Sequence, residues 1–234
     1  RHRNLLKEYR RQRQMCIRDS TKIDEKAISE YMSIQDASTD AETLLTMAGR
    51  NCYRSFHRPN EATYNDADYL RRTLAVLGHW SISEHATATL YFTGVSRAFL
   101  AELTRHRHLS FSVESQRFIN ANDANIVRPP AIECGAEICS LENVAETALE
   151  EYEVIVNSLT DDHNLPRKQA REAARAVLPN MVETRMVVTG NLRAWHEVIH
   201  RRTQPDADAE MQEVMRLAAK QLHPVSPIIF PKEN

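Results

Sequence analysis

The sequence predicts a mixed α/β fold, a modest sheet flanked by helices, and three observations lead to this class. Segments with helical apolar spacing alternate along the chain with short β-branched and aromatic runs. Residues that cap helices precede several of the helical segments. The 234 residues, 42% hydrophobic and 26% charged, suit one globular domain.

The first 20 residues differ from the rest of the chain. They are rich in arginine and lack a clear apolar face, and the run QRQMCIRDS resembles a translated cloning adapter. We expect residues 1–20 to be foreign or disordered and residues 21–234 to form one domain. A basic arm that binds nucleic acid is the alternative.

Capping residues mark the helices of the first half. Thr39 and Glu42 form a capping-box pattern before an apolar run. Asp66 is expected to cap a second helix, which ends near Gly78. Ser96 begins a third helix with the sequence SRAFLAELTRHR.

The remaining elements follow from β-branched runs and from helix punctuation. We expect strands at residues 86–93 (ATATLYFT) and 183–189 (ETRMVVT), a loop at 119–139, and helices at about 141–158, between Pro166 and Pro179, from Asn191 to about Arg202, and at about 207–222.

Composition excludes several classes of protein. Five glycines are too few for the glycine-rich phosphate loops of P-loop and Rossmann proteins. No run approaches the roughly 18 apolar residues of a membrane helix. The net charge of −2 gives no global reason to bind nucleic acid. The four cysteines, Cys16, Cys52, Cys134 and Cys139, match no zinc or disulfide pattern, which favours a reduced, cytoplasmic setting.

The densest polar segment is RHRHLSFSVESQRF, residues 105–118. Its arginines and histidines follow an apolar helix face, and Phe111 and Val113 then alternate with polar residues. Such a segment runs along the core and brings Ser115 and Arg117 to a defined place. Because arginine forms bidentate contacts with phosphate and serine adds a neutral donor, the segment predicts an anion site. A solvated helix face is the alternative.

Two later segments add arginines to the expected anion site. REAARAVLP places Arg171 and Arg175 one helical turn apart. NLRAWHEVIHRR carries Arg193 in its first turn and Arg202 at its far end. A cation in the first turn opposes the helix macrodipole, so Arg193 is expected to have an anionic partner. Surface salt bridges are the alternative for each arginine.

Histidines suggest a competing metal site. The candidate ligands are His79, His85, His106 and His108, with Glu84. Their spacing matches no zinc pattern, and the arginines around His106 and His108 repel a cation. We therefore expect no metal.

The string Arg105-His106-Arg107, seven residues and then Ser115 is similar to the signature of flavin-dependent thymidylate synthases. The preceding HWSISEHATATLYFTGVSRAFLAELTRHR and the later REAARAVLP, NLRAWH and RRTQPDADAEMQ also resemble segments of that family, in the same order. The resemblance covers about residues 40–225 and implies the thymidylate synthase-complementing protein fold.

The family resemblance also implies an activity and its partners. It implies methylation of dUMP to dTMP, with FAD as cofactor, 5,10-methylenetetrahydrofolate as one-carbon donor and NADPH as reductant. It implies a cytoplasmic homotetramer whose active sites are shared between subunits, with no nucleic-acid or membrane partner.

Site residues are carried over from the family one by one. Those expected to hold FAD are Ser81, Arg105, His106, Arg107, Asn191 and Arg193. Those expected to bind dUMP are Glu102, Arg105, Ser115, Gln116, Arg117, Arg175 and Arg202. Arg202 matches the arginine that polarises the uracil ring, so Arg202 and Ser115 are the expected catalytic residues. For Ser115 a binding role is favoured, because no activating base is evident. His79 matches a histidine near the pyrimidine and the folate.

Two positions depart from the family pattern. Val113 stands where many members carry Glu or Gln, and Glu197 stands where Asn or His reaches the flavin. A carboxylate at 197 either repels the phosphates of the cofactor or pairs with Arg193 at i, i+4. Two other functions therefore stay open: an inactive family relative, and a nucleic-acid-binding module that uses the Arg/His cluster with Phe111 and Phe118.

Overall fold

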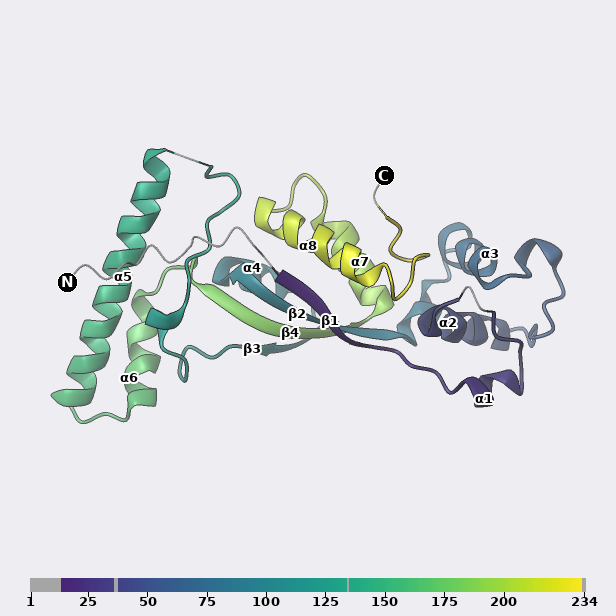
Figure 1. The fold of residues 1–234 in the computed structure, drawn as a ribbon, viewed down its shortest axis with the longest axis horizontal. Coiled ribbons are helices and arrows are strands. Elements are labelled where there is room, and N and C mark those ends of the chain that lie inside the picture. Colours follow the sequence, from purple (N-terminus) through teal and green to yellow (C-terminus); the bar gives the residue numbers. More distant parts are fainter. Residues whose placement is uncertain (1–13, 36–37, 134, 233–234) are drawn as a thin grey trace. The chain divides into compact units, whose positions relative to one another are not determined.

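The computed structural model describes residues 14–35, 38–133 and 135–232 (Figure 1). The helices of this part are α1 (Glu25–Ser29), α2 (Asp40–Asn51), α3 (Asp66–Leu70), α4 (Arg97–Leu103), α5 (Ala136–Asp161), α6 (Arg167–Ala174), α7 (Leu192–Arg202) and α8 (Ala209–Leu222). The strands are β1 (Gln14–Ser20), β2 (Thr87–Ser96), β3 (Ser110–Val113) and β4 (Glu183–Asn191). The strands form one sheet in the order β1-β2-β4-β3, which confirms the expected α/β class.

The chain forms two compact units, each assembled from segments that are distant in sequence. The first unit contains Phe92–Arg105 and Ser112–Val187, and the second contains Met15–Tyr91, His106–Phe111 and Val188–Asn234. Strands β2, β3 and β4 each contribute residues to both units. The single domain expected at 21–234 stays a prediction.

In the first unit, α5 and α6 lie side by side (Figure 1). Leu149, Tyr152 and Val156 of α5 share a buried cluster with Ala170 and Ala174 of α6. The small alanines let the two helices approach closely, and burying the large side chains stabilises the pair.

Helix α5 begins earlier than its sequence pattern suggests. It starts at Ala136, directly after Gly135 with φ 101°, and so occupies the end of the expected loop 119–139. Helix α6 continues as a 3-10 turn over Arg175–Val177. Leu178 is then extended, as expected for a residue before proline.

In the second unit, α7 packs beside α8 (Figure 1). Hydrogen bonds connect α7 to β2 and to Ala86, the residue before that strand. The Trp195 side chain is completely buried, and its Nε1–H donates to the Ala88 carbonyl at 3.0 Å. The Leu192 N–H donates to the Ala86 carbonyl at 2.9 Å. Asn191 caps α7 as expected, since its Oδ1 accepts from the Ala194 N–H at 2.8 Å.

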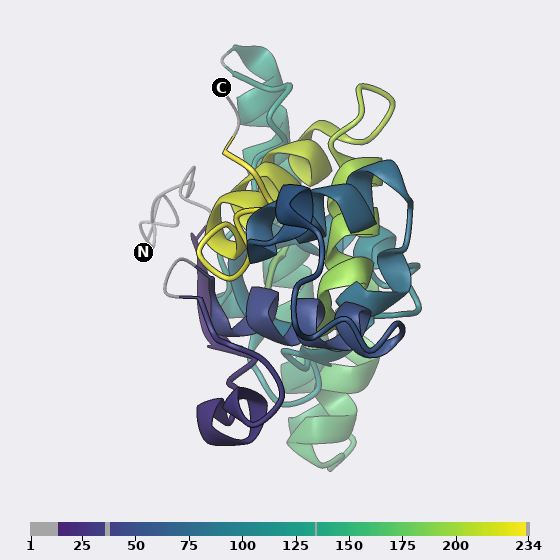
Figure 2. The same cartoon turned by 90° about the vertical axis from the view of Figure 1, so that its right-hand side faces the viewer.

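Helices α2 and α3 contact each other and lie toward the viewer in Figure 2. Their N-terminal caps follow the expected pattern only in part. Thr39 Oγ1 accepts from the Glu42 N–H, as in a capping box. The Glu42 carboxylate does not complete the box, because it accepts instead from Ser226 Oγ at 2.9 Å and the Ile228 N–H at 3.0 Å. A buried carboxylate must be hydrogen-bonded, and here the donors come from the C-terminal segment.

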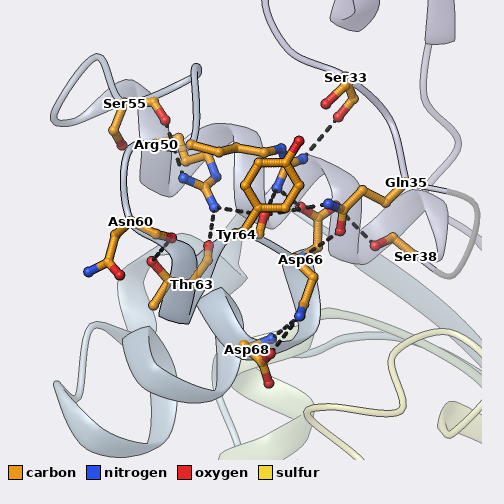
Figure 3. A network of polar contacts seen from close by, with 12 residues as sticks. Ser33, Gln35, Ser38, Arg50, Ser55, Asn60, Thr63, Tyr64, Asp66 and Asp68 are labelled. Atoms are coloured by element: carbon orange, nitrogen blue, oxygen red, sulfur yellow. Dashed lines mark hydrogen bonds and ion pairs between the residues drawn. The ribbon is translucent and has the colours of Figure 1, made fainter.

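The cap expected at Asp66 is corrected by the structure. Asn65 caps α3, with its Oδ1 accepting from the Asp68 N–H at 2.7 Å. The Asp66 side chain instead pairs with buried Arg58 (Figure 3). After α3 the backbone widens into a π-helical segment, Arg71–Val76, and the turn at Gly78 has φ 70°.

The N-terminal segment differs in part from the expectation. Residues 14–20 of the expected foreign stretch form β1, an edge strand next to β2. Residues 1–13 lie outside the described residues, and the foreign origin of the stretch stays a prediction. No helix in the described ranges is long and apolar enough to cross a membrane.

Candidate active site

The expected site residues divide between the two units. The first unit contains Glu102, Arg105, Ser115, Gln116, Arg117 and Arg175, and the second contains Ser81, His106, Arg107, Asn191, Arg193 and Arg202. The first set is drawn from the residues expected to bind dUMP. The second set contains most of those expected to hold FAD, together with Arg202.

A pocket of about 700 Å³ in the first unit brings together part of the first set. Its lining residues are Arg117, Lys168, Gln169, Glu172, Ala173 and Arg175. Helix α6 contributes four of them, and Arg175 lies in the 3-10 turn that follows. Three cations and one carboxylate give the lining a formal charge of +2, so the pocket attracts anions.

The Arg117 side chain pairs with a carboxylate of α6. Its Nε lies 2.7 Å from Glu172 Oε2, with both side chains about half exposed. Solvent screens a pair of this exposure, so the pair contributes little to stability and an anionic ligand can compete with Glu172. Lys168 Nζ lies 4.8 Å from the centre of the Phe118 ring. This cation–π contact stabilises the position of Lys168, another cation of the pocket.

The Ser115 hydroxyl takes part in a local turn. Its Oγ accepts from the Arg117 N–H at 3.3 Å. In the described part of the chain no imidazole or carboxylate is hydrogen-bonded to that hydroxyl. Without a base, a serine is a weak nucleophile. The geometry therefore favours a role in holding substrate.

The other expected residues of the first unit lie outside this pocket lining. Arg105 Nη1 is 3.3 Å from Glu102 Oε2 across one helical turn, and the Arg105 side chain is mostly exposed. Gln116 is half-buried. Arg97, which sequence reasoning missed, donates from Nη2 to the Glu114 carbonyl at 2.9 Å. Burial lowers the pKa of Arg97, as does the positive charge of Arg175.

A second pocket, of about 420 Å³, lies in the second unit. Its lining residues are Gly78, His79, Trp80, Ser81, Arg193, His196 and Glu197. They come from the 3-10 turn Trp80–Glu84 with the residues before it, and from the start of α7. The pocket unites Ser81 and Arg193 of the expected cofactor set with His79.

Arg193 has two carboxylate partners in its own unit. Its Nη1 lies 2.6 Å from Glu84 Oε1, and its Nε lies 3.0 Å from Glu197 Oε1. Hydrogen bonds to Glu197 and then to Glu84 raise the pKa of Arg193. The anionic partner expected for this first-turn arginine is therefore present within the chain, and no ligand is needed to explain its position. Of the two readings of Glu197, pairing with Arg193 is the one observed.

Two aromatic residues of this pocket were missed by sequence reasoning. Trp80 and His196 stack with ring centres 4.0 Å apart and an interplanar angle of 22°. The His200 ring lies parallel to that of His196 at 6.1 Å. Burial, and then the charge of His200, lower the pKa of His196, so the stacked imidazole is neutral near pH 7. The i, i+4 spacing of His196 and His200 on α7 is the sequence signal that could have indicated their stacking.

Arg202 contacts His106, the histidine of the RHR signature. Its Nε donates to His106 Nε2 at 2.8 Å. Arg202 is the last residue of α7, and His106 lies in the turn that follows α4. Arg107, the next residue, is exposed. Across the described ranges, no group of three or more His, Cys, Asp or Glu residues is arranged to hold a metal ion.

Comparison with known proteins agrees with these features. A family model described as thymidylate synthase complementing protein matches residues 33–228. The chain is 51% identical over 194 residues to a probable flavin-dependent thymidylate synthase of Mycobacterium phage L5, covering 80% of this chain and 79% of that one. It is 46% identical over 205 residues to the flavin-dependent thymidylate synthase of Mycobacteroides abscessus, covering 83% and 82%.

The fold also matches a solved structure. Thymidylate synthase X from Helicobacter pylori, crystallised with FAD and dUMP, superposes with a TM-score of 0.65. The match covers 94% of this chain and 97% of that chain at 20% sequence identity, which supports likeness of fold alone. Together, the signature, the family model and the relatives show that this chain belongs to the thymidylate synthase complementing protein family, the family of the flavin-dependent thymidylate synthases.

Proposed function

We propose that this chain is a flavin-dependent thymidylate synthase that methylates dUMP to dTMP. In this proposal FAD is the cofactor, 5,10-methylenetetrahydrofolate donates the one-carbon unit and NADPH is the reductant. The observation that carries the proposal is the first-unit pocket, whose three cations and one carboxylate match a phosphate monoester. The names of the phage and bacterial relatives support the same activity.

The phosphate of dUMP would bind Arg117, Lys168 and Arg175. A phosphate monoester carries a charge of about −1.5 to −2 near pH 7, which the formal +2 of the lining balances. Arg117 can present a planar fork to two phosphate oxygens once it leaves Glu172, and the Ser115 hydroxyl adds a donor. Glu102, Arg105 and Gln116 are proposed to contact the same nucleotide.

The second-unit pocket fits part of FAD better than the whole molecule. Trp80, His79 and Ser81 give it an aromatic and hydroxyl lining that suits a flat ring. Its only cation, Arg193, already pairs with Glu84 and Glu197, which leaves this group a formal charge of −1.

The diphosphate of FAD therefore needs cations and donors beyond this pocket. We assign the cations Arg105 and Arg107 and the imidazole of His106 to it, and Arg193 contributes from the pocket itself. Asn191 would use its amide N–H groups, because its oxygen caps α7. FAD held by these residues would supply the hydride-transfer and one-carbon-transfer chemistry, so the protein would need no nucleophile of its own.

Arg202 would stabilise the negative charge that develops on the uracil ring. A guanidinium held in a fixed direction needs no reorganisation as that charge appears, and preorganised donors of this kind contribute much of the catalysis in enzymes.

We further propose a cytoplasmic homotetramer with shared active sites. Each pocket holds only part of the expected site residues, and symmetric copies can complete a site that one chain leaves open. Among the described cysteines, Cys16, Cys52 and Cys139 are free, as in a reduced compartment.

Release of tritium from dUMP labelled at ring carbon 5 tests the proposed function. The purified protein should release tritium with FAD, 5,10-methylenetetrahydrofolate and NADPH, and should lose this activity when FAD is omitted. A protein that retains flavin, shown by its absorbance, but releases no tritium would contradict the proposal and favour an inactive relative.

A further inference from the structure

Arg202 and His106 form a hydrogen bond whose direction identifies the tautomer of the imidazole. The guanidinium Nε of Arg202 carries a hydrogen and can only donate, so His106 Nε2, 2.8 Å away, must accept with its lone pair. The imidazole is therefore neutral, with its proton on Nδ1. A protonated ring would point an N–H at a cation and break the bond.

This bond constrains a side chain that otherwise has many rotamers. Arg202 ends α7, where the backbone no longer continues as helix, and its side chain is half-buried. Ordering a free arginine side chain costs conformational entropy. Because the guanidinium is planar, holding Nε in one direction also sets the direction of both terminal nitrogens.

We propose that His106 is a positioning residue that acts through Arg202. By accepting a hydrogen bond from Arg202 Nε, His106 fixes the plane of the guanidinium. The terminal Nη groups of Arg202 then face the pyrimidine of the substrate in a fixed orientation. The inference rests on the proposed function, and it gives the histidine of the RHR signature a second task beside the expected contact with FAD.

Two variants of His106 separate positioning from packing. His106→Leu keeps the volume and removes the acceptor, whereas His106→Gln places an amide oxygen near the position of Nε2. His108→Leu removes an exposed imidazole from the same segment and serves as the control. Turnover and KM for dUMP would be measured by tritium release, with the flavin spectrum and circular dichroism as checks of folding.

We expect His106→Leu to lower kcat about 10- to 100-fold with a smaller change in KM, because a misplaced catalytic group can cost up to about 10²-fold. His106→Gln should recover at least a third of this loss in kcat, measured on a logarithmic scale. The kcat of His108→Leu should stay within about threefold of wild type. Equal losses in the Leu and Gln variants, or no loss in the Leu variant, would overturn the proposal.

A double-mutant comparison tests whether the effect passes through Arg202. If it does, His106→Leu should add less than about threefold to the loss already caused by Arg202→Ala, since coupled residues are not additive. Additive losses would show that His106 acts elsewhere.

A spectroscopic test is independent of activity. Nitrogen-15 NMR of the folded protein should show His106 Nε2 unprotonated, and Arg202→Ala should change its shift. A wild-type chain that shows this signature without releasing tritium would refute the proposed function while leaving the hydrogen bond intact. A protonated Nε2 in an active enzyme would refute the positioning role.

Discussion

Arg58 Nη1 lies 2.6 Å from Asp66 Oδ1, and both side chains are almost completely buried. Figure 3 shows Asp66 within the surrounding network of polar contacts. Arg58 also donates to the carbonyls of Tyr64 at 2.6 Å and Ser33 at 2.9 Å. A second buried arginine, Arg50, donates to the Thr63 carbonyl at 2.6 Å. Burial, and then the charge of Arg58, lower the pKa of Arg50. Asp66 therefore pairs directly with Arg58 and acts on Arg50 through its charge alone, while backbone carbonyls accept from both guanidinium groups.

Asp66→Asn should therefore destabilise the protein by about 3–5 kcal/mol, because it leaves buried cations without their counter-charge. Urea unfolding followed by circular dichroism would measure the change. Asp68→Asn is the matched control, since Asp68 pairs with Arg71 at 3.0 Å in an exposed position. That variant should lose less than about 1 kcal/mol. Equal losses in the two variants would show that burial of the Arg58 pair is not what matters.

Local signals in the sequence are enough to predict the helix starts at Thr39, Ser96 and Asn191. In each case a short polar side chain accepts from a backbone N–H three residues on. Such a cap depends on neighbours in the chain alone, so no tertiary information is needed. The cap at Asp66 was wrong for a tertiary reason: burial with Arg58 recruited the carboxylate, and Asn65 took the cap.

The sequence indicates candidate residues for the site, but it does not predict how they are arranged. The signature and the i, i+4 spacing indicated the arginines and the pair Arg193–Glu197. Glu84 and His106, however, contact Arg193 and Arg202 from 109 and 96 residues away in the chain. No spacing rule connects residues so far apart. Trp80 and Lys168 were missed because one aromatic or one lysine has many ordinary roles, and only their positions in the two pockets single them out.

Arg202→Ala should keep the fold and the flavin and lose most turnover. Removing one preorganised donor to a developing negative charge typically lowers kcat by about 10²–10³-fold. Tritium release and the flavin spectrum of the same preparation would be compared. A variant within a few-fold of wild type would rule out Arg202 as the charge-stabilising residue.

Arg117→Ala and Ser115→Ala should weaken dUMP more than FAD. Loss of an arginine–phosphate contact should cost about 2–3 kcal/mol of binding free energy, and loss of a neutral hydroxyl donor about 0.5–1.5 kcal/mol. Calorimetry with dUMP and with deoxyuridine would isolate the phosphate, because neither variant should change deoxyuridine binding by as much. Unchanged dUMP affinity in both variants would remove the phosphate from the first-unit pocket.

The protein should be an obligate oligomer, with a tetramer expected. Light scattering would give a mass near four times 26.9 kDa. If a shared site takes Arg117 from one subunit and Arg202 from another, chains carrying Arg117→Ala and chains carrying Arg202→Ala should regain partial activity when they are mixed and reassembled. An active monomer would contradict shared active sites.

Glu197→Gln should tighten FAD binding. Glu84 and Glu197 both contact Arg193, and all three side chains are about half exposed. A diphosphate that approaches Arg193 must compete with these carboxylates, so removing one negative charge relieves repulsion and frees a donor. Because solvent screens charges of this exposure, the gain should be modest, about two- to fivefold in Kd. Fluorescence titration of the apoprotein with FAD would measure this change in Kd, and rising salt should shrink the difference between variant and wild type.

Glu172→Gln is the matched control, because it removes the equivalent carboxylate beside Arg117. It should leave FAD affinity unchanged and tighten dUMP binding instead. Weaker FAD binding by Glu197→Gln would mean that the carboxylate holds Arg193 or the flavin in place, and the repulsion argument would then be wrong.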